Sequence, residues 1–222
     1  MSAIALNNID PEDIDDLLIR VTHSFNITLE PNECKGISTF GELSDLIIKK
    51  TQGININDCT TQQAFYKIRS AIVNTLSLDN TMITPKTLLE NIFPRKGRIR
   101  QIRTMEKTLG FKLRVLRPAH LTSAVLLIIL FASIILLFTS WLLGLTMLLI
   151  TTAGFYIATK TGKELNLKTV GEIVAVMAQE EYKKSRRYPQ TVNKKEIEKL
   201  LIDWFSRELD ISKSKLTKDA TF

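Results

Sequence analysis

One stretch of the chain carries no charge, and it limits the fold more than any other feature. From Leu121 to Thr159 there is no Asp, Glu, Lys, Arg or His. A helix needs about 20 apolar residues to cross the hydrocarbon core of a bilayer, so this run is long enough for two. The sequence predicts a hairpin of two membrane-spanning helices, over 121–138 and 142–159, joined by a short polar turn.

Basic residues on both sides of this run favour two crossings over one. Three lie just before it and three just after it: Lys112, Arg114 and Arg117, then Lys160, Lys163 and Lys168. Cytoplasmic flanks of membrane helices are enriched in Lys and Arg. Matching flanks therefore place both chain ends in the cytoplasm, at the cytoplasmic membrane. A single tilted span and a buried hairpin in a soluble protein are the alternatives.

The rest of the chain reads as short amphipathic helices. Asp10 and Pro11 are typical of a helix start, and apolar residues then recur at helical spacing up to Phe25. No segment alternates with period two for long enough to predict a strand. The predicted class is all-α with a membrane hairpin.

Four places have the spacing of a capping box, in which two side chains three residues apart satisfy the first turn of a helix. They are Thr39 with Glu42, Thr60 with Gln63, Thr169 with Glu172, and Asn193 with Glu196. Two of them belong to near copies: residues 37–47 read ISTFGELSDLI, and residues 167–177 read LKTVGEIVAVM. The chain therefore repeats itself across the predicted hairpin.

The repeat extends beyond these helix starts. Residues 61–84 align without gaps to 194–217, and SFNITL at 24–29 has a counterpart in TLGFKL at 108–113. Apolar residues occupy matching positions in the longer alignment: Ile68 and Leu201, Ile72 and Phe205, Leu76 and Leu209, Leu78 and Ile211, Ile83 and Leu216. Self-similarity of this kind indicates one structural unit used twice.

The order of these motifs resembles the acyl carrier protein family. ELDISKSKLTKDATF, at residues 208–222, is similar to the end of the family's first helix and its long loop, and residues 24–47 are similar to the second half of the fold. The resemblance implies an all-α protein with two acyl-carrier-like helical bundles plus a transmembrane helical hairpin.

The same resemblance implies an unusual domain organisation. One bundle would combine residues 1–50 with 190–222, as a circular permutation. The second would combine residues 58–118 with 160–185, and the hairpin of residues 120–159 would be inserted in it. Insertions and permutations are tolerated at exposed loops, and both ends of an inserted hairpin emerge on one side of the membrane.

The residue that carries the family's prosthetic group is missing. Acyl carrier proteins bear phosphopantetheine on a Ser that opens the second helix, and the matching positions are Pro11 in one bundle and Arg95 or Lys96 in the other. These side chains offer no hydroxyl, so we expect no cofactor. The resemblance then implies a non-enzymatic, membrane-anchored scaffold or docking protein for an acyl-transfer or lipid-biosynthesis enzyme. The alternative is a genuine acyl carrier protein modified at a non-standard Ser.

Charge differs between the two predicted bundles, within a chain whose net charge is +7. In acyl carrier proteins the second helix is typically acidic and docks basic enzyme surfaces. The resemblance therefore implies the same docking role for an acidic set in this chain: Asp10, Glu12, Asp13, Asp15 and Asp16. The other bundle carries a basic set before the membrane: Arg95, Lys96, Arg98, Arg100, Arg103 and Lys107. We interpret the basic set as a site for anionic lipid head groups or an acidic partner. A solvated, positively charged flank is the simpler alternative, and nucleic acid is not expected because no aromatic residues interleave the arginines.

The last predicted helix, 194–209, has an apolar stripe that includes Trp204 and Phe205. Because an isolated helix of this length is marginal in water, we expect it to pack against 11–25 and 39–49. Closure within one chain and segment exchange in a homodimer are both open. His and Cys residues are few and scattered, so no metal or catalytic site is predicted: His23, His120, Cys34 and Cys59.

Overall fold

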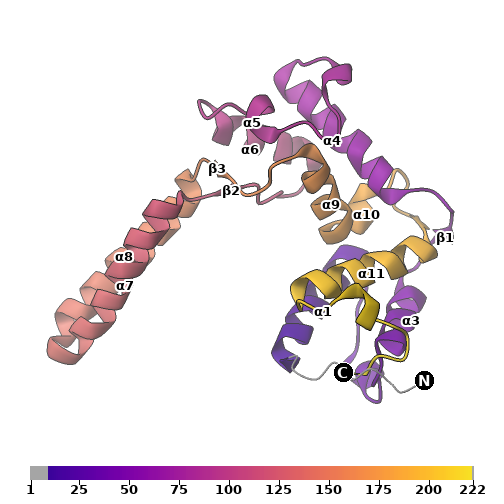
Figure 1. The fold of residues 1–222 in the computed structure, drawn as a ribbon, viewed down its shortest axis with the longest axis horizontal. Helices are drawn as coiled ribbons and strands as arrows, with labels where there is room; N and C mark the ends of the chain where they lie inside the picture. Colours follow the sequence, from indigo (N-terminus) through magenta and orange to yellow (C-terminus); the bar gives the residue numbers. More distant parts are fainter. Residues whose placement is uncertain (1–9, 222) are drawn as a thin grey trace. The chain divides into compact units, whose positions relative to one another are not determined.

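The computed structural model describes residues 10–221, and it is mostly helical, which confirms the predicted class at that level (Figure 1). The α-helices are α1 (Pro11–Phe25), α2 (Pro31–Cys34), α3 (Phe40–Lys50), α4 (Thr60–Leu76), α5 (Leu89–Ile92), α6 (Arg98–Leu109), α7 (His120–Thr139), α8 (Trp141–Thr161), α9 (Val170–Glu180), α10 (Tyr182–Ser185) and α11 (Lys194–Glu208). Two short 3-10 helices are η1 (Asn80–Met82) and η2 (Lys213–Lys215). In the described part of the chain, four two-residue strands form two small pairs: β1 (Ile54–Asn55) parallel to β4 (Thr191–Val192), and β2 (Leu116–Arg117) antiparallel to β3 (Glu164–Leu165).

The chain divides into two compact units. The first unit contains the residues up to Lys67 together with those from Val174 onward, and the second contains Ile68–Ile173. Segments from both ends of the sequence therefore belong to the first unit, while the second is continuous and includes α7 and α8.

Helices from both ends of the chain share the core of the first unit. Each contributes buried apolar residues: Leu17, Val21 and Phe25 from α1, Phe40, Leu43 and Ile47 from α3, and Ile197, Leu201, Trp204 and Phe205 from α11. The rings of Phe40 and Phe205 lie 5.2 Å apart, centroid to centroid. The apolar stripe of α11 is thus covered by α1 and α3 of the same chain.

The two near-identical helix starts make the same hydrogen bonds, each inside its own unit. At the start of α3, the N–H of Gly41 donates to the carbonyl of Lys218 over 3.0 Å; at the start of α9, the N–H of Gly171 donates to the carbonyl of Pro85 over 2.8 Å. A Cβ at Gly41 would lie 2.6 Å from the Lys218 oxygen, and one at Gly171 would lie 2.9 Å from the Pro85 oxygen. Only glycine lets the backbone of these distant loops approach the helix start this closely.

We expect Gly41→Ala and Gly171→Ala to destabilise the unit that each belongs to. Alanine in an unobstructed helix is more stable than glycine by roughly 0.5–1 kcal/mol. Here the added methyl would meet backbone, which cannot swing aside as a flexible side chain can, and overpacking costs about 1–3 kcal/mol. Thermal unfolding of the full chain in detergent, followed by circular dichroism, should show a lower midpoint for both variants. A raised midpoint for either would mean that its loop is not held against the helix.

Two of the four predicted capping boxes form largely as expected. The Thr39 hydroxyl accepts from the N–H of Glu42 over 3.2 Å, and the Glu42 carboxylate accepts from the N–H of Thr39 over 3.1 Å. Backbone N–H donors from Ser38 and Thr39 lower the pKa of Glu42 below its ordinary value. At the second site, the Thr169 hydroxyl accepts from the N–H of Glu172. The Glu172 carboxylate accepts from the N–H of Lys168 instead of that of Thr169.

The other two predicted boxes are replaced by a cap between helices. Asn193 accepts from the N–H of Glu196 over 3.3 Å, but the Glu196 carboxylate binds the N–H of Thr60 at the start of α4, over 2.9 and 3.0 Å. Gln63 accepts from the N–H of Arg187 instead of capping α4. The prediction for Thr60 and Gln63 was therefore wrong, because packing brings a carboxylate to the positive end of the α4 dipole.

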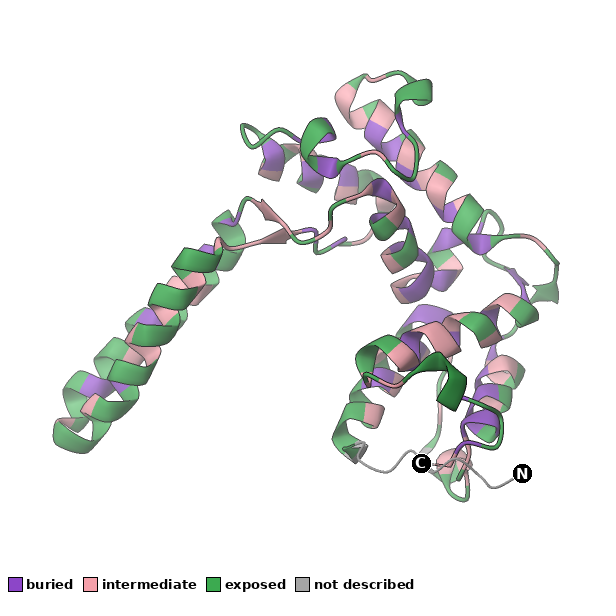
Figure 2. Cartoon of the chain, in the orientation of Figure 1, coloured by how far each residue is buried: buried purple, intermediate pink, exposed green. Residues whose placement is uncertain are grey.

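The charge-free run forms the two helices α7 and α8, which turn at Ser140 and lie side by side (Figure 1). Both are long and apolar enough to cross a membrane, and most of their surface is exposed (Figure 2). The buried positions in α8 are all small: Gly144, Thr151 and Ala158, at heptad spacing. Small residues let two helix backbones approach closely in a membrane.

We expect Gly144→Ala to loosen the turn end of this hairpin and Gly154→Ala to be tolerated. A Cβ at Gly144 would lie 2.5 Å from the backbone nitrogen of Leu137, whereas one at Gly154 would meet only a terminal methyl of Leu126, at 2.9 Å. Overpacking of about 1–3 kcal/mol should speed amide exchange around Leu137 in detergent micelles. Equal exchange in the two variants would contradict the close backbone approach.

Candidate functional site

The basic set lies on and just before α6. Ile102 and Met105 are buried and fix one face of this helix against its unit. The opposite face carries exposed charges from Arg100, Arg103 and Lys107. Amphipathic spacing thus turns the basic residues outward for the same reason that it turns the apolar ones inward.

Arg98 is placed differently from the other members of the set. It is 7% exposed, its Nε donates to the Phe93 carbonyl over 2.8 Å, and its Nη1 donates to the Lys163 carbonyl over 2.6 Å. A buried guanidinium with these partners holds the start of α6 in place. Arg98 also lines a pocket on α6, but its guanidinium is engaged by these two backbone carbonyls, so a docking role for Arg98 stays a prediction.

Two further arginines contact the last turn of α8 or the segment that follows it. Arg103 Nη2 donates to the carbonyl of Lys160 over 2.9 Å, and Arg95 Nη2 lies 2.8 Å from a carboxylate oxygen of Glu164. Together with Arg98, they connect α6 and the turn before it to residues 160–164. The basic helix is therefore fastened beside the end of the apolar hairpin.

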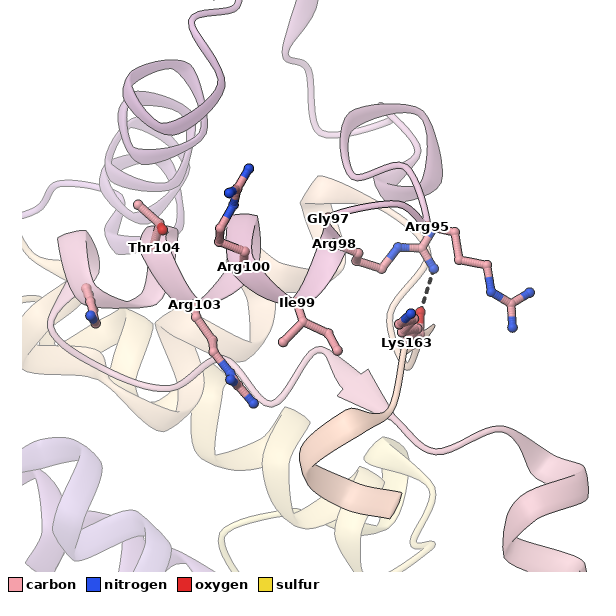
Figure 3. A pocket seen from close by; sticks show the side chains of 9 residues that line it. Arg95, Gly97, Arg98, Ile99, Arg100, Arg103, Thr104 and Lys163 are labelled. Carbon is pink, nitrogen blue, oxygen red and sulfur yellow. Dashed lines mark hydrogen bonds between the residues drawn. The ribbon is translucent and has the colours of Figure 1, made fainter. Parts of the chain in front are cut away.

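A pocket of about 480 Å³ opens along α6 (Figure 3). Its lining includes the side chains of Arg95, Arg100, Arg103, Lys107 and Lys163, and no acidic residue of the described chain lines it. In the view of Figure 3 the side chains of Arg100 and Arg103 point in different directions from the exposed face of α6, so the basic groups are spread along the opening. Of the predicted basic set, only Lys96 lies outside this lining, in the exposed turn before α6.

The acidic set lies at the start of α1, and all five residues are exposed: Asp10, Glu12, Asp13, Asp15 and Asp16. Asp10 also has a structural role, because its carboxylate accepts a hydrogen bond from the N–H of Glu12 over 3.1 Å and so caps α1. Negative charge is favourable at a helix N-terminus. None of the five forms an ion pair within the part of the chain that the structure describes. They remain available to a basic partner.

The positions at which the sequence comparison placed the modified Ser of acyl carrier proteins lie at, or just before, helix starts. Pro11 is the first residue of α1, and Arg95 and Lys96 lie in the turn before α6. Among residues 10–221, no three His, Cys, Asp or Glu side chains gather as metal ligands. What these sites offer is charge, positive at α6 and negative at α1.

Sequence reasoning missed a buried polar network around Arg186. This residue is fully buried, donates to the hydroxyls of Thr60 and Thr191 over 2.8 and 2.9 Å, and pairs with Asp58. In the sequence it stands in a run of basic residues, KKSRR, which is typical of a solvated surface. No local pattern distinguishes it from its exposed neighbour Arg187.

No protein-family model, curated protein or solved structure matches this chain. Its function is therefore argued from its own residues and their arrangement.

Proposed function

We propose that this chain is a non-enzymatic scaffold of the cytoplasmic membrane, whose two acyl-carrier-like bundles dock acyl- or lipid-handling enzymes on the cytoplasmic side. The observation that carries the proposal is the helix start that occurs twice with the same backbone contacts. Gly41 meets Lys218 as Gly171 meets Pro85, and each pair belongs to a unit without a Ser at the position that would bear the prosthetic group.

Other backbone features support one module used twice. Left-handed residues fall at matching positions of the repeat, Ser77 with Asp210 and Asn26 with Gly110. The short helices η1 and η2 also match in the alignment, residue for residue. Left-handed conformations in non-glycine residues are uncommon, so their recurrence favours duplication over coincidence. A permuted bundle across the chain ends explains why α11, α1 and α3 share a core.

The membrane part of the proposal is supported by the surface of α7 and α8. Their long apolar side chains are largely exposed, among them Leu121, Phe131, Phe138, Trp141 and Ile150. A soluble protein rarely exposes a contiguous apolar surface of this size, whereas a bilayer covers it. The basic flanks on both sides favour cytoplasmic ends.

The proposed lack of carrier activity is tested by intact mass. The full chain is incubated with a phosphopantetheinyl transferase and coenzyme A, with a genuine acyl carrier protein as the positive control. We expect no added phosphopantetheine, because Pro11, Arg95 and Lys96 have no hydroxyl. A mass gain that maps to a Ser would reject the scaffold and support a carrier modified at a non-standard position.

The proposed topology is tested by cysteine labelling in intact cells. Cys34 and Cys59, both free thiols, are replaced by Ser, and single cysteines are introduced as Thr139→Cys at the hairpin turn or Ser214→Cys near the chain end. A membrane-impermeant maleimide should label Thr139→Cys from outside and reach Ser214→Cys only after lysis. Labelling of Ser214→Cys in intact cells would reject the cytoplasmic placement.

A further inference from the structure

We infer that the pocket along α6 binds the phosphate of an anionic phospholipid head group. This inference rests on the proposed membrane anchoring and adds a ligand to it. Its first support is the composition of the pocket. Six cationic side chains line it, Arg98 among them, without an acidic residue from the described chain, and phosphate is recognised in proteins by clustered Arg and Lys donors.

The cations differ in how far the protein already uses them. Arg95 is paired with Glu164, and Arg103 gives one donor to the Lys160 carbonyl. A guanidinium has five N–H donors, so Arg103 keeps others for a ligand. Arg100 and Lys107 form no ion pair within residues 10–221, and both are exposed. Among the cations that line the pocket, only Arg95 has a carboxylate partner within residues 10–221, so most of the positive charge is not neutralised by the protein.

The start of α6 adds to this charge. Gly97 precedes the helix in a left-handed conformation, with φ of 85°, and provides no side chain to cap the first turn. Gly97 and Arg98 both line the pocket. The first N–H groups of an uncapped helix, and the positive end of its dipole, favour an anion.

The pocket lies beside the end of α8, and this location favours a membrane lipid as the source of the phosphate. Lys163 lines the pocket and comes two residues after the end of α8. The carbonyl oxygens of Lys160 and Lys163, where the chain leaves the hairpin, are bound by Arg103 and Arg98. The head groups begin where the hydrocarbon core ends. The lipids that surround α8 would therefore bring their phosphates to the rim of this pocket.

The experiment compares two variants of the full chain with equal loss of charge. Arg100→Gln with Lys107→Gln removes two pocket cations that hold no part of the fold. Lys86→Gln with Lys195→Gln removes two exposed charges outside the pocket. Each protein, purified in a non-ionic detergent, is titrated with phosphatidylglycerol or with zwitterionic phosphatidylcholine, and bound lipid is counted by native mass spectrometry.

We expect one saturable phosphatidylglycerol site in the wild type and in the control. In the pocket variant its affinity should fall about 30-fold, since each cation near a lipid surface contributes about five-fold. Equal affinities in pocket variant and control, or equal binding of both lipids, would overturn the inference. Inorganic phosphate in excess is the third arm: if it displaces the lipid completely, the pocket serves a soluble phosphoester and the lipid assignment fails.

These outcomes are separable from those of the proposed function. The mass and labelling tests use no added lipid, so they can succeed while the head-group site fails. If Thr139→Cys is not labelled from outside, the anchoring itself is rejected, and the lipid inference falls with it.

Discussion

Trp204→Ala should destabilise the first unit by about 3–5 kcal/mol, as expected for an aromatic residue removed from a packed core. Trp204 is fully buried in the C-terminal half of α11, in one core cluster with residues of α1 and α3. Its loss leaves a cavity between segments from opposite ends of the sequence. Native-state hydrogen exchange of the full chain in detergent should show faster exchange for the core amides of both α1 and α11.

Two further variants separate packing from other effects. Trp204→Phe keeps a ring in the site and removes an indole N–H that has no partner among the described residues, so its cost should be clearly smaller than that of Trp204→Ala. Tyr188→Ala changes an aromatic residue that is 54% exposed and should alter stability by less than about 0.5 kcal/mol. If Trp204→Ala affects α11 but leaves exchange in α1 unchanged, the shared core would be disproved.

Arg186→Met should cost about 3–5 kcal/mol, because breaking a buried ion pair leaves the remaining partners without compensation. The variant keeps most of the volume but leaves Asp58 and the hydroxyls of Thr60 and Thr191 without their donor. Asp58 is a third exposed, so water can reach it and the lower part of this range is expected. Urea unfolding of the full chain in detergent gives the measurement.

Arg186→Lys and Lys184→Met are the informative companions. Lysine keeps the charge but cannot reproduce the planar fork of donors, so Arg186→Lys should recover only part of the loss. Lys184 lies two residues before Arg186 and is half exposed, and its ammonium forms an ion pair with Glu181. Its replacement should cost at most about 1 kcal/mol. Similar losses for Lys184→Met and Arg186→Met would mean that the network contributes nothing beyond ordinary surface charge.

Several features could be predicted from the sequence because they depend on neighbours along the chain. The apolar hairpin follows from an uninterrupted run without charge, and its observed ends lie within two residues of the predicted ones. The cap formed by Thr39 and Glu42 depends on side chains three residues apart. The outward charges of α6 follow from helical periodicity. The sequence also shows that Gly41 and Gly171 occupy equivalent positions of the repeat, but it does not show why glycine is required there.

That reason, and the roles of the charged residues, were decided by tertiary structure. Glycine is needed at Gly41 because a loop from the other end of the chain presses its backbone against the helix. Glu196 caps α4 instead of its own helix, and Arg98 is buried while Arg100, two residues later, is exposed. Such side chains can reach several hydrogen-bond or ion-pair partners, and the local sequence does not indicate which of these partners is used. Only the packing of distant segments determines which partner is near and which charge loses its water, and desolvation then makes that pairing obligatory.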